Sequence, residues 1–175
     1  SEETHQKIIN GDIRVIVANV PDAGWGQPIA TALSNIVDGH VCTIIRDKAP
    51  PKPDLMDQRL PDWAHAGEYI VGVAPDADRA LPPLLASIVE LRIDVPPADA
   101  ELVAEVLRHC QLGDVPAEAL DLTPQVLSFD ELCSLIPQGG KATETVARLK
   151  SAIVRKFDAG GRKRKSLPRL EDAIE

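Results

Sequence analysis

The chain has very few aromatic residues. Phe, Trp and Tyr make up 3% of its 175 residues. The core must therefore consist mainly of Leu, Val, Ile and Ala, and few rings are left to stack on nucleic-acid bases or sugars. Long hydrophobic runs are also missing, because no apolar stretch approaches the ~18 residues that a membrane-spanning helix needs.

Cysteine is also scarce. The three cysteines, Cys42, Cys110 and Cys133, are odd in number, widely spaced and in no C-x-x-C pattern. We interpret them as reduced, buried thiols of a cytosolic protein rather than as a disulfide framework. The amino terminus lacks the charged and then apolar pattern of a signal peptide, which favours the same cytoplasmic location.

Basic residues are outnumbered, with 19 Lys and Arg against 27 Asp and Glu, giving a net charge of −8. This balance argues against a nucleic-acid surface that covers the whole domain. One dense basic cluster stands near the carboxyl end, at Arg162, Lys163, Arg164 and Lys165. Its main interpretation is a solvated linker, and its alternative is a contact with a partner.

A hydrophobic content of 44% predicts a packed core, and the pattern of apolar residues predicts an α/β fold. Runs rich in Val and Ile predict strands at residues 12–20, 39–46, 69–73 and 91–95. A Gly-containing turn at 21–28 and helices at 29–37 and 81–88 connect them. Such alternation favours a small parallel sheet of about four strands flanked by helices. Residues 1–11 are expected to be disordered, and the proline-rich segment 47–62 to be an extended loop.

The remaining chain predicts helices only. Asp99 stands at an N-cap position before a helix that begins at about Ala100. Thr123-Pro124 resembles a helix start, and Ser128 with Glu131 forms a capping box. After a turn at Gly139-Gly140, a last helix is expected to run to about Phe157. We therefore divide the chain into an α/β core (12–110), a helical lid-like lobe (111–157) and a basic linker (158–175) that leads toward a downstream module.

The stretch from residue 69 to residue 110 resembles the second half of an AAA+ ATPase module. In that family, a strand leads into an L-x-P-A-L-L segment, a second strand of the type R-I-x-V-P, and then P-x-D before a lid helix. The matching residues are Leu81, Pro83, Leu84, Leu85, Arg92, Ile93, Val95, Pro96 and Asp99. The resemblance implies a sheet in which strand 91–95 lies beside the first strand, followed by strand 69–73 and then strand 41–46.

The rest of the chain resembles the divergent amino-terminal region of a group of bacterial AAA+ ATPases. The similar segments are 122–149 and the connector 167–173. In that group, an active module with a complete phosphate-binding loop follows downstream. The resemblance implies that this chain is a degenerate AAA-like region from a bacterial ATPase.

The turn after the first strand departs from a working phosphate-binding loop. Laid over the family motif, Gly24 and Gly26 remain, Gln27 replaces the lysine, and Pro28 replaces the serine or threonine that holds magnesium. Pro21 stands at the position of the first glycine. We interpret the loop Gly24, Gly26 and Gln27 as vestigial, and expect no bound ATP or magnesium in this part of the protein.

The other catalytic elements of the family are missing as well. The strand that ends at Arg46-Asp47-Lys48 has no adjacent Glu to serve as a base, and Ala86, Ser87 and Ile88 stand where family members often place an arginine. The histidines show no metal-binding spacing: His5, His40, His65 and His109. No catalytic triad is indicated around the serines Ser34, Ser87, Ser128 and Ser134. We interpret Asp54, Asp57 and Asp62 as solvated charges rather than as an acid pair.

The sequence therefore predicts a non-catalytic regulatory or assembly domain of an AAA+ ATPase, and not an enzyme in itself. Its expected partners are the downstream module and neighbouring subunits of a ring, with a protein substrate or adaptor as a further option. Two alternatives stay open. One is a weak nucleotide-binding ATPase domain, and the other is an adaptor that binds protein or nucleic acid through the proline-rich loop and the basic cluster.

Overall fold

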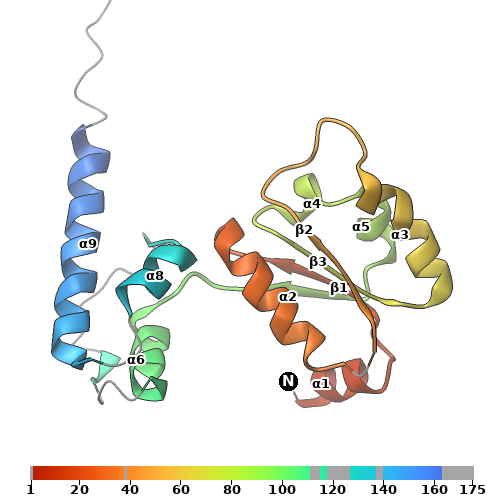
Figure 1. Ribbon diagram of the computed structural model, residues 1–175. Coiled ribbons are helices and arrows are strands. Elements are labelled where there is room, and N and C mark those ends of the chain that lie inside the picture. Colours follow the sequence, from red (N-terminus) through yellow and green to blue (C-terminus); the bar gives the residue numbers. More distant parts are fainter. Residues whose placement is uncertain (1, 38, 111–114, 118–126, 137–139, 163–175) are drawn as a thin grey trace, which may run out of the picture. The chain divides into compact units, whose positions relative to one another are not determined.

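The structure is a computed structural model that describes residues 2–37, 39–110, 115–117, 127–136 and 140–162, with side chains as far as residue 158 (Figure 1). The chain divides into two compact units, Ser1–Pro97 and Ala98–Glu175. The sequence predicted this boundary at about Cys110. The helix that follows Asp99 was therefore expected in the first unit, but it groups with the second.

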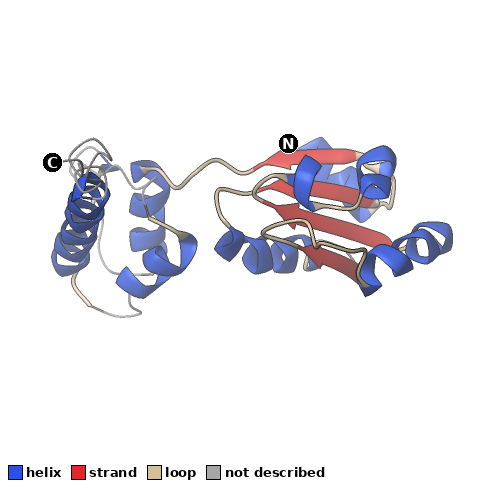
Figure 2. Ribbon diagram, turned by 90° about the horizontal axis from the view of Figure 1, so that it is seen from above, coloured by secondary structure: helices blue, strands red, loops and turns tan. Residues whose placement is uncertain are grey.

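The first unit contains a four-stranded parallel sheet. Its strands are β1 (Val15–Asn19), β2 (Val41–Ile45), β3 (Tyr69–Ala74) and β4 (Leu91–Asp94), in the order β2-β3-β1-β4 (Figures 1 and 2). β1 lies between β3 and β4, with Val17 paired to Gly72 on one side and to Arg92 on the other. The α/β fold predicted from the sequence is confirmed, and so is the strand order.

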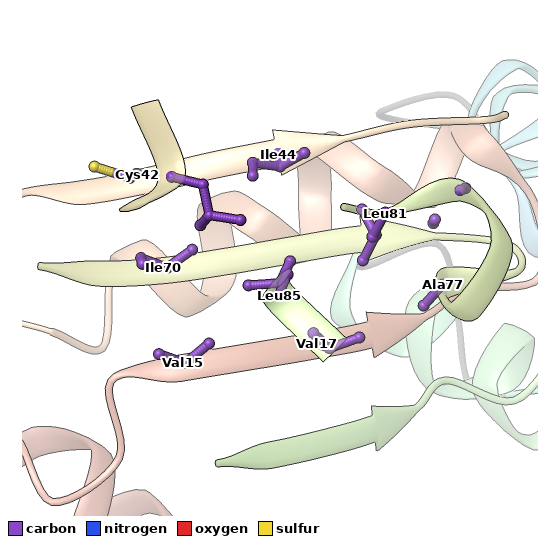
Figure 3. Packing of buried hydrophobic residues seen from close by; sticks show 11 residues of the cluster. Val15, Val17, Cys42, Ile44, Ile70, Ala77, Leu81 and Leu85 are labelled. Atoms are coloured by element: carbon purple, nitrogen blue, oxygen red, sulfur yellow. The ribbon is translucent and has the colours of Figure 1, made fainter. Parts of the chain in front are cut away.

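Successive residues of β1 point to opposite faces of the sheet, and both faces are buried. On one face, Val15 and Val17 pack with α3 (Leu55–Ala66), α4 (Ala77–Ala80) and α5 (Pro83–Ile88). Figure 3 shows Leu81 and Leu85 over β3 and β1 on this face. On the other face, Ile16 and Ala18 pack with α1 (Glu2–Ile9) and α2 (Gly26–Ser34). Coverage of both faces explains why the strands are nearly continuous apolar runs.

The prediction of a disordered amino terminus is wrong, because residues 2–9 form α1. Glu2 and Glu3 favour the first turn, and Lys7 pairs with Glu3 one turn away. Tertiary contact decides the outcome: Ile8 is buried against the sheet, and the Tyr69 hydroxyl donates to the Ile8 carbonyl at 3.1 Å.

The prediction of an extended loop over residues 47–62 is wrong in its second half. α3 begins at Leu55 and contains Pro61. Asp54 and Asp57 form a capping box, Leu60 is fully buried, and Gly67 ends the helix in a left-handed conformation. Together these contributions outweigh the cost of one proline inside the helix, which is about 3 kcal/mol.

The second unit contains α6 (Ala100–His109), α8 (Phe129–Leu135) and α9 (Ala142–Arg162). The predicted caps are confirmed: Asp99 accepts from the Leu102 amide, and Ser128 and Glu131 form the capping box. α9 extends five residues beyond the expected end at Phe157. Thr123-Pro124, Gly139 and the connector 167–173 lie outside the described residues.

Candidate functional site

The carboxyl ends of β1 and β3 form the position where open α/β sheets usually bind ligands. β1 and β3 are neighbours in the sheet. α2, which follows β1, packs on one face, and α4 and α5, which follow β3, pack on the other. Neighbouring strands whose connections leave toward opposite faces open a crevice at their carboxyl ends. The turn that contains Gly24, Gly26 and Gln27 lies at this crevice.

Several amide groups in and beside the turn already have partners within the chain. A short 3-10 helix, Ala23–Trp25, follows Asp22, whose carboxylate accepts from the Gly24 amide at 2.9 Å. The Trp25 amide donates to the Asp22 carbonyl, and the Val20 amide donates to the Ala74 carbonyl. A phosphate-binding loop instead points such amides at the ligand. Here the Asp22 carboxylate already accepts the hydrogen bond from one amide that a phosphate would need.

Gly26 is required by packing. A Cβ atom built at Gly26 would lie 2.6 Å from the Cγ2 methyl of Ile45 on β2. This methyl is attached to a β-branched carbon and cannot move aside easily. The side chain of Gln27 donates to the Thr31 hydroxyl at 3.3 Å, and Pro28 lies in the first turn of α2, where proline is tolerated. The turn is therefore built to seat α2 on the sheet.

Asn19, which the sequence analysis did not single out, closes the crevice from the other side. Its side-chain amide donates to Asp94 of β4 at 2.6 Å, and its carbonyl oxygen accepts from the Ala77 amide of α4 at 3.1 Å. One side chain thus ties three elements together and occupies the first amide of α4. In the sequence, the signal for this role was a polar residue at the end of an apolar strand.

Arg46 organises the end of β2. Its side chain is 8% exposed, and its guanidinium lies 2.7 Å from Asp54 and 3.1 Å from Asp57. Burial lowers the pKa of Arg46, but the hydrogen bond that Arg46 donates to Asp57 and its pairing with Asp54 outweigh burial and raise this pKa. The pKa of Asp54 is lowered, first by a backbone hydrogen bond from Asp57 and further by Arg46. The prediction that Asp54 and Asp57 are merely solvated charges is therefore wrong.

A pocket of about 520 Å³ lies beside Arg46. Its walls come from the proline-rich segment and from the α4–α5 region, and they include Pro50, Pro51, Pro53, Pro82, Pro83 and Leu84. Prolines have no amide N–H to donate, so these walls offer mainly apolar contact. Asp57 and Asp78, which also line the pocket, are paired with Arg46 and Arg92.

A third arrangement, Cys42 with His40 and Glu68, has the composition of a nucleophile site but the wrong geometry. The Cys42 sulfur and a Glu68 oxygen both approach the same nitrogen, Nδ1 of His40, at 3.6 and 3.8 Å. A working dyad with an orienting carboxylate uses both ring nitrogens. Burial, and then Glu68, raise the pKa of the Cys42 thiol, which disfavours the reactive thiolate.

The three cysteines differ in exposure. Cys42 is buried as expected, Cys110 is half-buried, and Cys133 is exposed, so the expectation of buried thiols is wrong for Cys133.

The other predicted site residues form no reactive cluster in the described part of the chain, which has no group of metal-binding side chains and no helix that could cross a membrane. The hydroxyls of Ser34, Ser87 and Ser134 donate to backbone carbonyls. Arg162 ends α9, and Lys163, Arg164 and Lys165 lie outside the described residues.

Comparison with known proteins gave no family model, no curated protein and no solved structure that matches this chain.

Proposed function

We propose that this chain is a non-catalytic assembly or regulatory domain of a larger AAA+ ATPase. One observation carries the proposal: the turn at the crevice has no lysine, and its Gly24 amide is taken by the Asp22 carboxylate. Phosphate binding at this turn would have to displace a local carboxylate without a cation to favour the exchange. The α/β fold does not depend on phosphate binding, so its surface can still form contacts with other subunits.

The first experiment is a calorimetric titration of ATP and magnesium into the chain. We expect no saturable heat up to about 1 mM nucleotide, which corresponds to a binding free energy weaker than about −4 kcal/mol. ATP hydrolysis measured on the same sample should remain at the buffer rate.

Gln27→Glu is the matched variant for this titration. Gln27 is exposed at the start of α2, so the substitution leaves the packing of Gly26 and Ile45 unchanged. It adds a negative charge where a phosphate would lie. If the unmodified chain bound ATP and Gln27→Glu lost that binding, the proposal would be overturned in favour of the nucleotide-binding alternative.

A second arm tests the assembly role in the longer protein that the proposal requires. Removing residues 1–157 from a parent chain that carries an ATPase module is expected to change the number of subunits that associate. Sedimentation velocity with and without this region measures that number. An unchanged assembly, together with ATP binding by the isolated chain, would contradict both parts of the proposal.

A further inference from the structure

β4 is a terminal strand of the sheet. It pairs with β1 along one edge, in the order β2-β3-β1-β4, and no other strand among the described residues pairs with its outer edge. In a parallel ladder, the backbone groups of alternate residues point to opposite edges of the strand. The outer edge of β4 therefore presents N–H and C=O groups that a further strand can bind.

An apolar groove accompanies this edge. Its volume is about 600 Å³, and its lining comes from α1, from α2 and the turn after it, and from β4, including Ile8, Leu33, Ile36, Leu91 and Ile93. Leu91 and Ile93 are only half-buried, whereas Ile16 and Val71 on the inner strands of the same face are 1% and 3% exposed. The apolar face of β4 is thus left partly covered.

The opposite face of β4 carries two charges. Arg92 and Asp94 are both exposed and alternate with the apolar Leu91 and Ile93. Within the chain, Arg92 pairs with Asp78 of α4 at 2.9 Å, and Asp94 accepts from Asn19. The strand therefore has one apolar face and one face with a positive and a negative residue two positions apart.

We propose that β4 joins two copies of this chain, which pair antiparallel about a two-fold axis centred on Ile93. Such an axis, perpendicular to the sheet, preserves the two faces, so each β4 residue can only oppose a residue of the same face. Centring on Ile93 places Arg92 opposite Asp94 of the second copy, and Asp94 opposite its Arg92. Centring on Arg92 or on Asp94 would place like charges opposite each other. Centring on Leu91 would place Arg92 opposite Glu90, but the Glu90 carboxylate already accepts from the Arg14 and Val15 amides, and Asp94 would have no charged partner. The register centred on Ile93 is therefore the one that pairs both charges of β4.

The same symmetry explains why a second copy fits better than an unrelated strand. The half-buried Leu91 and Ile93 of both copies come to lie on one face of the joined sheet, beside both grooves. A partner must offer the same alternation with charges in complementary order, and β4 itself does so when reversed. The inference uses a different edge from the crevice and goes beyond the proposed function, because self-association through β4 can occur whether or not the turn at Gly24 binds nucleotide.

The test is sedimentation velocity over about 1 to 200 µM chain, the range in which short-strand contacts of moderate affinity form. We expect a monomer–dimer equilibrium. Arg92→Asp and Asp94→Arg should each weaken the dimer about tenfold or more, because each turns two opposite-charge pairs into two like-charge pairs. The combined variant Arg92→Asp/Asp94→Arg restores opposite charges at both positions and should return to within about threefold of the unmodified chain.

Asp78→Asn is the matched control. It removes the internal partner of Arg92 without changing the edge, so the dimer should persist unchanged or tighter. Circular dichroism of every variant reports whether the sheet is intact.

A second measurement fixes the register. In a background of Cys110→Ser and Cys133→Ser, Ile93→Cys should form a disulfide-linked dimer, because directly opposed Cα atoms lie about 4.5–5.5 Å apart. Arg92→Cys should crosslink poorly, since its two copies would lie diagonally, about 7–8 Å apart. A chain that stays monomeric throughout, a combined charge variant as weak as the single ones, or equal crosslinking at both positions would overturn the inference.

Discussion

At the scale of the residue, the buried cation Arg46 fixes the proline-rich segment to the rest of the first unit. Nothing in the sequence alone indicates this contact. Its guanidinium contacts Asp54 and Asp57, and one of its nitrogens donates to the Ala80 carbonyl at 3.4 Å. The proline-rich segment, α3 and α4 are thereby joined at one point. The two acidic residues serve twice, since they also form the capping box of α3.

Replacing Arg46 should therefore destabilise the first unit. Arg46→Met keeps most of the volume but leaves Asp57, which is 16% exposed, without its cation. We expect the free energy of unfolding in urea to fall by about 2 kcal/mol. Arg46→Lys offers a single ammonium for two carboxylates, so its free energy of unfolding should lie between those of the unmodified chain and Arg46→Met. Equal stability of all three chains would show that the pairs contribute nothing.

The lowered pKa of Asp54 predicts the pH dependence of this contribution. Its folded pKa lies below the unfolded value of about 3.8, so the stabilisation is fully present above that pH. It is lost as the pH falls through the folded pKa. Urea unfolding between about pH 5 and pH 2 should show a shallower loss of stability for Asp54→Asn than for the unmodified chain. The same slope in both chains would contradict the assignment.

At the scale of the element, the contact between α2 and β2 sets the shape of the turn after β1. The helix approaches the strand so closely at Gly26 that the Ile45 methyl occupies the space of a side chain. A glycine that resembles part of a nucleotide motif is thus explained by packing alone.

Gly26→Ala should lower the free energy of unfolding by about 1–3 kcal/mol through overpacking. Ile45→Ala removes the opposing methyl and is expected to cost about 2 kcal/mol when made alone. If the two groups collide as the structure shows, the combined variant should be more stable than the sum of both losses predicts, by about 1 kcal/mol. Strict additivity in urea denaturation would mean that Gly26 has another role.

At the scale of the whole molecule, the first unit builds the core around its sheet from its own residues. Every residue in the two core clusters that cover the sheet lies within residues 1–97. The second unit has its own buried side chains, among them Leu107, Leu132 and Leu149. A unit whose core comes entirely from its own segment can fold by itself.

A fragment of residues 1–97 should therefore fold without the second unit. We expect a single cooperative urea transition with an m value of about 1 kcal/mol/M, as is usual for a domain of this size. Its midpoint should match one transition of the whole chain. A fragment with no cooperative transition would show that the sheet depends on the helices after Pro97.

Regular patterns in the sequence predicted much of this architecture. The apolar strands, the alternation with helices, and the caps at Asp99 and Ser128 are local signals, because the backbone groups that they satisfy lie within a few residues. The absence of a lysine from the turn was equally visible, because it is a matter of residue identity.

What only the tertiary structure decided depends on residues that are distant in the sequence. Arg46 meets the Ala80 carbonyl, Asn19 meets Asp94 and Ala77, and Gly26 meets Ile45. α1 folds because Ile8 finds the sheet, and α3 tolerates Pro61 because Leu60 is buried. Local propensity cannot reveal such contacts, because each becomes favourable only after the chain has brought the two segments together. The sequence by itself therefore determined the class of fold and the absence of a lysine from the turn after β1, and tertiary packing determined how the crevice is closed.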